Sequence, residues 1–276
     1  MTRVIGANTF LLLLTTDESS AQTRTLSPRA SSAAGGRAAG RGGRTAPWAL
    51  SLLHGFELRR GGESVRVPFP AQRVLALLAL RRVALRRTYV AGVLWLDATE
   101  AHAAGSLRSA LWKLRRSCGD LVEDVDHRLR LAPSVSVDVR DAEAWAERVS
   151  NPAVPIDDAD LDAGSWPGEL LPDWYEDWVA LERERLRQVH AYARETLCSS
   201  LVAEGRFAEA IRVGLAAVAR EPCRESAHRA VIAAHLGAGN RAEAARQYSL
   251  YRSLLADALG LAPSPSLLDL VGDALP

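Results

Sequence analysis

The sequence predicts a mainly α-helical protein with small β elements, organised as two ordered parts. Short strand-like segments flank three helical segments between residues 48 and 131, and helical patterns dominate from residue 141 to the C-terminus. The 276 residues are 48% hydrophobic and 24% charged, which is enough apolar material for real cores. Three scattered cysteines exclude a disulfide scaffold. The longest apolar run, residues 74–80, is too short to span a bilayer, so no membrane contact is expected.

The charge is unevenly distributed along the chain, although the net charge is only +1. Residues 1–46 carry six arginines and two acidic residues, and residues 47–134 carry 14 basic and 8 acidic residues. Residues 135–276 carry 14 basic and 23 acidic residues. A basic first half joined to an acidic second half indicates a polyanion-binding module attached to a second part. The alternative is that helix surfaces are charged in blocks by chance.

The first 46 residues are predicted to be a disordered N-terminal segment. Ala, Gly, Arg and Ser dominate residues 27–47, and these residues bury little apolar surface. An apolar pentad at residues 10–14 is followed by Asp17 and Glu18 and not by a cleavage site. We therefore do not expect a secretory signal, and we expect the protein to be cytoplasmic.

Strands open and close the first ordered part, residues 47–134. A strand is expected over residues 50–58, with a Gly-Gly turn at residues 61–62 and a returning strand over residues 64–67. A β-hairpin is expected within residues 121–131, where alternating apolar residues flank a polar turn. These strands enclose a helical centre.

Three helices form that centre. The first, about residues 70–82, is apolar most of the way round, so it should be buried. The second, about residues 88–95, has Thr88 as a candidate N-cap. The third begins with a capping-box-like pattern at residues 97–100 and ends near Gly119, a natural C-cap. The order of strands, three helices and hairpin predicts a winged helix-turn-helix.

The third helix has a cationic face that suits the major groove of DNA. At 100° per residue, its core stripe is expected to consist of Ala104, Leu107, Leu111 and Leu114. The opposite side carries side chains that can donate to bases or phosphates, namely His102, Ser106, Ser109, Lys113 and Arg116, with Trp112 on the flank. We predict that this face binds double-stranded DNA; the alternative is an ordinary solvated helix face.

Two further places are expected to contact the DNA. Arg86, Arg87 and Thr88 lie at the start of the second helix, where the positive helix end favours phosphates. His127 and Arg128 lie at the tip of the predicted hairpin, where a wing would touch the minor groove or the backbone.

An internal repeat marks the second part, residues 135–276. The hexapeptide that begins at Gly205 (GRFAEA) recurs at Gly239 (GNRAEA), 34 residues later. This is the period of tetratricopeptide (TPR) helix pairs, so an α-helical TPR-like domain is expected.

Motifs in both parts resemble those of the SARP family of transcriptional activators. FELRRGGESVRVP, AQRVLALLALRR and SLRSALWKLRR resemble the OmpR/PhoB-type winged helix, and DWVALERERLR, GRFAEAI and ALGLAPSP resemble the bacterial transcriptional activator domain. The resemblance implies side-by-side protomers, a homodimer on direct-repeat operators, and recruitment of RNA polymerase holoenzyme. It also implies control of secondary-metabolite genes, including antibiotic clusters.

The chain departs from the family pattern in two places. Leu96 stands where the family commonly has a proline, in the loop thought to face the polymerase. Cys118 stands where an apolar residue is usual. Larger relatives carry an ATPase module, but no Walker motif occurs here, so ATP dependence is not expected.

No enzyme chemistry is predicted, and neither catalytic residues, metal ligands nor a cofactor are expected. There is no Gly-x-Ser-x-Gly elbow, and His228 and His235 lie two helical turns apart, too far to chelate one ion. The carboxylates of residues 157–162 lack the spacing of a calcium loop and are expected to form a solvated acidic linker. An aromatic cluster follows this linker and is expected to be an interdomain core or, alternatively, a small-ligand pocket: Trp166, Trp174, Tyr175 and Trp178.

These observations favour a sequence-specific, DNA-binding transcriptional activator. Two alternatives stay open. In the first, the helical repeat is a protein-interaction scaffold and the winged helix binds a protein. In the second, the same winged helix serves a repressor, because the sign of regulation depends on where the operator lies.

Overall fold

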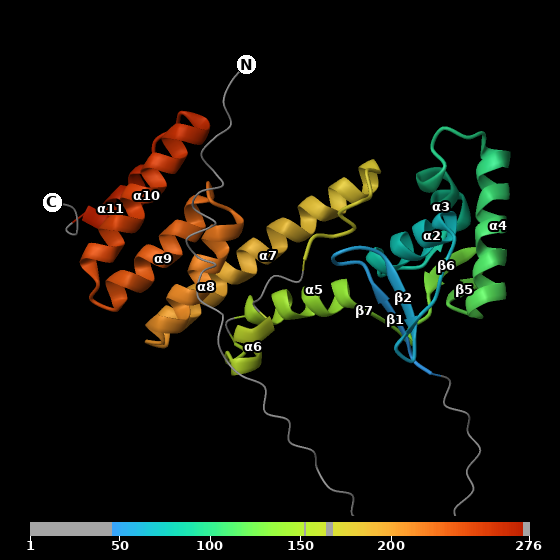
Figure 1. Ribbon diagram of the computed structural model, residues 1–276, viewed down its shortest axis with the longest axis horizontal. Helices are drawn as coiled ribbons and strands as arrows, with labels where there is room; N and C mark the ends of the chain where they lie inside the picture. The colour runs from blue at the N-terminus through green and yellow to red at the C-terminus, as the bar shows by residue number, and fades with distance from the viewer. Residues whose placement is uncertain (1–45, 152, 164–167, 273–276) are drawn as a thin grey trace, which may run out of the picture. The chain divides into compact units, whose positions relative to one another are not determined.

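The computed structural model describes residues 46–151, 153–163 and 168–272 (Figure 1). The predicted disordered segment lies outside the described residues, except for Ala46 at its end. Within the described ranges, no helix combines the length and apolar character needed to cross a membrane.

A four-stranded sheet opens the fold, in the order β3-β2-β1-β7. Its strands are β1 (Trp48–Ser51), β2 (Glu57–Arg60), β3 (Glu63–Ser64) and β7 (Val135–Val137). The prediction of one strand over residues 50–58 is wrong, because His54 and Gly55 have positive φ values (69° and 137°) and reverse the chain between β1 and β2. The hairpin places Leu50 opposite Leu58, and both are buried. Strand β7 pairs in parallel with β1.

Helix α2 (Phe69–Leu80) is the central helix of this part, as predicted. Pro70 occupies its first turn, and every residue from Val74 to Leu80 is buried. The core around α2 also includes buried side chains of α3 (Arg87–Leu94) and α4 (Glu100–Cys118). The buried side chains of α2, α3 and α4 therefore form one apolar core.

The caps and the core stripe of α3 and α4 differ from the prediction. Thr88 is not an N-cap, because α3 begins one residue earlier and Arg86 occupies the cap position. Helix α4 is capped by Thr99, whose Oγ1 accepts the backbone N–H of His102 at 3.4 Å, and not by the expected pattern at residues 97–100. Gly119 is the C-cap, as predicted. The buried residues of α4 are Ala103, Leu107, Ala110, Leu114 and Cys118, while Ala104 and Leu111 are only half-buried.

The predicted β-hairpin is present and forms a wing. Strands β5 (Val122–Val125) and β6 (Arg128–Leu131) pair in antiparallel fashion, and β4 (Leu85–Arg86) adds to β6. Asp126 and His127 form the turn with positive φ values of 52° and 59°.

Two shorter helices follow the sheet. Helix α5 spans Asp138–Val149 and α6 spans Asp158–Ala163. The expected solvated linker is wrong at Asp160, which is fully buried and forms an ion pair with Arg148. Trp145 explains the burial, because its indole N–H donates to the Asp160 carbonyl at 3.2 Å.

The remaining helices form the predicted TPR-like array. They are α7 (Asp177–Ala203), α8 (Phe207–Arg220), α9 (Glu225–Gly237), α10 (Arg241–Leu259) and α11 (Pro265–Val271). Gly205 and Gly239 have φ values of 74° and 76°, so each ends a helix in the left-handed conformation. Ala210 and Ala244, 34 residues apart, are both completely buried. The fold is thus mainly α with small β elements, a winged helix-turn-helix followed by a TPR-like helical array.

The predicted aromatic cluster is only partly formed. Trp174 stacks on Phe56 at 6.2 Å and packs edge-on against Phe69 and Trp178. Tyr175 is not part of it, because 91% of its surface is exposed. Trp166 lies outside the described residues.

An ion-pair network joins α5 and α7 to the two arginines that directly follow α2. Glu143 of α5 accepts from Arg82 at 2.8 Å and from Arg185 of α7 at 2.5 Å. Glu182 of α7 is bound by Arg81 at 2.9 Å and by Arg185 at 2.8 Å. Both glutamates are buried, so the arginines compensate charges that would otherwise be costly in the interior.

Candidate nucleic-acid interface

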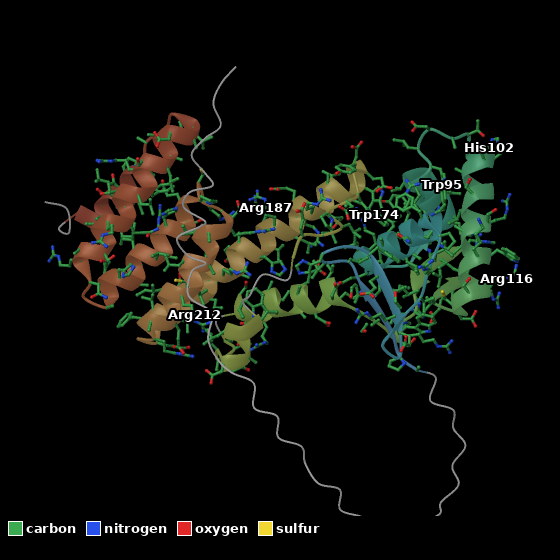
Figure 2. All side chains as sticks on the ribbon, viewed as in Figure 1. Trp95, His102, Arg116, Trp174, Arg187 and Arg212 are labelled. Carbon is green, nitrogen blue, oxygen red and sulfur yellow. The ribbon has the colours of Figure 1, made fainter. Side chains whose placement is uncertain are left out.

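The outer side of α4 carries polar and cationic side chains, as predicted. Five of the six α4 residues proposed to contact DNA are exposed and Ser106 is half-buried; the exposed five are His102, Ser109, Trp112, Lys113 and Arg116. At 100° per residue, Trp112 and Arg116 lie most directly opposite the buried side of the helix. Figure 2 shows His102 near the start of α4 and Arg116 near its end, on its outer side.

The predicted face is divided between two sides of the helix. A groove beside α2 is lined by Pro70, Trp95 and four of the predicted residues: His102, Ser106, Ser109 and Lys113. A second groove, between α4 and the wing, is lined by Trp112 together with Arg108, Arg115 and Val125. The prediction treated these side chains as one face because a helical wheel does not show which side the wing covers.

Arg108 is a further exposed cation of α4, which was not predicted to contact DNA. It lines a hollow together with Arg87 and Thr88 of α3 and His127 of the wing tip. This hollow brings the predicted α3 residues next to the predicted wing residue. The signal available in the sequence was the position of Arg108 one turn before Trp112, on the outer half of α4.

The start of α3 is tied to the wing. The backbone N–H of Arg87 donates to the His127 carbonyl at 3.0 Å, and the Arg87 guanidinium forms an ion pair with Asp124. Arg128 donates to the Ala84 carbonyl at 3.4 Å. Arg86 and Thr88 are exposed. Arg87 is therefore partly neutralised by the wing, whereas Arg86 keeps its charge available.

The cations of α4 differ in how they are compensated. Arg115 is paired with Asp120 at 3.3 Å. Among the described residues, no carboxylate lies within 4 Å of Arg108, Lys113 or Arg116. The Arg116 guanidinium instead lies over the Trp112 ring, 5.4 Å from its centroid. Three uncompensated cations on one exposed helix surface attract a polyanion.

The two family departures have clear structural positions. Leu96 is 79% exposed in the turn between α3 and α4. Cys118 is buried in the core, and this burial raises the pKa of its thiol above the ordinary value. Among the described residues, no group of three or more His, Cys, Asp or Glu side chains could hold a metal ion.

Comparison with known proteins agrees with this architecture. Residues 138–273 match the family model of the bacterial transcriptional activator domain. The regulatory protein AfsR of Streptomyces coelicolor is 30% identical over 225 residues, covering 76% of this chain and 22% of AfsR. The chain is therefore similar to regulators of the SARP family, and its second half matches the bacterial transcriptional activator domain. The family model and the relatives that match this chain belong to regulators of transcription and not to enzymes.

Two further relatives define the extent of the likeness. AfsR of Streptomyces griseus is 27% identical over 227 residues, covering 76% of this chain and 23% of that protein. The chain thus spans less than a quarter of the length of the AfsR proteins that it matches. Mycobacterium tuberculosis EmbR, solved in complex with a low-affinity phosphopeptide, shares the fold with a TM-score of 0.64 at 21% identity, over 83% of this chain and 65% of EmbR.

Proposed function

We propose that this chain is a SARP-family regulator that binds double-stranded DNA in a sequence-specific manner and activates transcription. The observation that carries the proposal is the outer surface of α4, where Arg108, Lys113 and Arg116 have no carboxylate within 4 Å among the described residues. An α-helix of 19 residues with such a surface fits the major groove, and Arg or Lys there donates to guanine O6 and N7.

Phosphate contacts are assigned to the two flanks of that surface. Arg86, Arg87 and Thr88 lie at the positive end of α3, and His127 and Arg128 lie at the wing tip. Such contacts fix the orientation of the protein on the duplex but carry no sequence information. We therefore assign specificity to α4 and general affinity to α3 and the wing.

We assign separate roles to the two predicted parts of the chain. We propose that residues 47–134 bind DNA and that residues 135–276 support dimerisation and regulation. Protomers on direct repeats would be spaced by about one duplex turn, roughly 10–11 bp. The exposed turn around Leu96 is the proposed contact with RNA polymerase holoenzyme. A regulator of this kind acts on the nucleoid, in the cytoplasm, and its target genes would include a secondary-metabolite cluster.

Selection of bound sequences from a random DNA library by the full chain tests this proposal. We expect enrichment of a direct repeat, followed by a gel shift that survives excess random competitor DNA. Transcription in vitro from a promoter that carries the repeat should then rise when the protein is added to purified polymerase holoenzyme. Absence of any enriched sequence would contradict the DNA-binding proposal and favour a protein-interaction scaffold, while a fall in transcription would indicate a repressor.

A further inference from the structure

Trp112 and Arg116 form a cation–π pair on the outer side of α4. They lie four residues apart, so their side chains are neighbours on the helix surface. The guanidinium carbon of Arg116 is 5.4 Å from the centroid of the Trp112 ring, within the range of a cation–π contact. This contact restrains an arginine that would otherwise sample many rotamers.

The fold itself gives no reason for a tryptophan at this position. The Trp112 side chain is 60% exposed and does not belong to the apolar core around α2 and α4. On the other side of α4, Leu107 and Leu114 are already fully buried without it. An exposed aromatic ring beside a cation is suited to an apolar contact with a nucleic-acid base.

Arg116 differs from the neighbouring cations in what it can donate. Arg115 is paired with Asp120, which occupies part of its donor edge. Lys113 offers a compact charge without a planar fork. Arg116 lies over the Trp112 ring and has no carboxylate within 4 Å among the described residues, so its N–H groups remain available to donate to two acceptors at once.

The chemistry of the pair matches two adjacent bases. The N–H edge of an arginine fits guanine O6 and N7, and an apolar side chain fits the methyl group of thymine. Side chains four residues apart on a helix are about 5–6 Å apart, and successive bases on one strand are about 3.4 Å apart along the duplex axis. One such pair therefore reaches neighbouring base pairs.

We propose that Trp112 and Arg116 act together as a reader of a thymine next to a guanine. Arg116 is the specificity-determining donor to guanine. Trp112 contacts the thymine methyl group and is also the positioning residue that holds Arg116. This inference rests on the proposed DNA-binding function and adds the base step that one part of α4 recognises.

Base analogues in the selected operator test the pair. Uracil in place of the thymine removes only the methyl group, and 7-deazaguanine in place of the guanine removes only N7. With the full wild-type chain we expect the uracil operator to bind about fourfold more weakly, the contribution of one buried methyl group. We expect the 7-deazaguanine operator to bind more weakly as well.

Protein variants assign these effects to the two side chains. W112A should lose the discrimination between thymine and uracil and should weaken the response to 7-deazaguanine. R116A should lose the response to 7-deazaguanine and bind the unmodified operator about 10- to 100-fold more weakly. W112F, which keeps an aromatic face, should restore both responses in part. R115A is the matched control and should keep both responses. Circular dichroism should show wild-type thermal unfolding for W112A, because the ring is exposed.

The outcomes separate this inference from the general function. If W112A still distinguishes thymine from uracil, or R116A still responds to 7-deazaguanine, the paired reader is wrong although specific DNA binding stands. An enriched operator without any thymine–guanine step also overturns it. If the wild-type chain enriches no sequence at all, the DNA-binding proposal itself fails.

Discussion

Helices α4 and α7 are both rich in arginine, yet the structure uses their charges in opposite ways. On α7, Arg183, Arg185 and Arg187 are each bound to at least one carboxylate. On α4, Arg108 and Arg116 have no carboxylate within 4 Å among the described residues. Paired arginines hold helices together, whereas uncompensated ones leave a potential for an external anion. A count of charged residues therefore indicates a binding surface only when it is known which of these residues form ion pairs within the fold.

The largest expected effect comes from breaking the ion-pair network that joins α5 and α7. Replacing Glu143 with alanine leaves the charges of Arg82 and Arg185 without their shared partner. The side chains of Arg82 and Arg185 are 46% and 43% exposed and each keeps a second carboxylate, so we expect a loss of about 1.5–3 kcal/mol in the free energy of unfolding, measured by urea denaturation at pH 7. Glu147→Ala is the control, because Glu147 is exposed and lies 3.7 Å from Arg82, so its loss should cost less than about 1 kcal/mol. Equal losses of unfolding free energy in the two variants would show that the ion-pair network does not stabilise the fold.

Acid should also weaken the helical part. Burial and, to a lesser extent, the nearby Arg194 lower the pKa of His190 from 6.5 to about 4, against the opposing effect of Glu143. His190 is therefore protonated below about pH 6.5 in the unfolded chain but only below about pH 4 in the folded chain. Stability is fully present above pH 6.5 and falls as the pH drops towards 4, by on the order of 1–3 kcal/mol.

Denaturant titrations at pH 7, 6, 5 and 4 measure this slope. His190→Gln should flatten it, whereas His102→Gln, at an exposed position on α4, should leave it unchanged. His228 is also buried and its pKa is also lowered by burial, so the H190Q slope should be reduced and not abolished. A slope identical to that of the wild type in H190Q would contradict the assignment.

On α4 the expected effect is on DNA and not on folding. Arg116→Ala should cost about 1–3 kcal/mol in binding to the selected operator and much less on random DNA. Arg187→Ala on α7 is the matched control and should leave the dissociation constant unchanged, because Arg187 pairs with Glu184 at 2.7 Å. Fluorescence anisotropy on labelled duplexes gives both constants. Equal weakening of R116A on both DNAs would make Arg116 a phosphate contact.

The two helix ends in the repeat should respond alike to substitution. Gly205 and Gly239 have φ values of 74° and 76°, so alanine at either position costs roughly 1–2 kcal/mol of strain. Gly92 in α3 is the control: it has no positive φ, and a Cβ there would meet nothing within 4 Å. Gly92→Ala should be neutral or slightly stabilising in thermal unfolding. A neutral result at either repeat glycine would argue against equivalent helix ends.

The smallest effect is expected at the start of α3. Arg86→Ala should weaken binding on all sequences alike and reduce the slope of log affinity against log salt by about one unit. Binding measured between about 50 and 200 mM salt gives that slope. An unchanged slope would remove Arg86 from the interface.

Local patterns in the sequence predicted the elements that depend on local physics. The apolar α2, the wing turn at Asp126 and His127, and the 34-residue spacing of Gly205 and Gly239 are all present in the structure. Periodicity and turn chemistry act over a few residues, so one sequence is enough to find them.

The predictions that were wrong concern features that depend on residues distant in the sequence. The reversal at His54 and Gly55 and the burial of Asp160 against Arg148 each depend on packing or backbone geometry that the local pattern does not contain. For the same reason the sequence predicted the outer residues of α4 but not their division between two grooves. Which charges are compensated is a tertiary property.

The most direct test of the central claim is a charge-neutralised α4. The triple variant R108A/K113A/R116A should retain its fold by circular dichroism but lose at least about 100-fold in affinity for the selected operator. The matched triple variant in α7, R183A/R185A/R187A, should lose stability while the part that remains folded binds the operator as the wild type does. Operator binding by the α4 variant at wild-type strength would show that this surface does not read DNA.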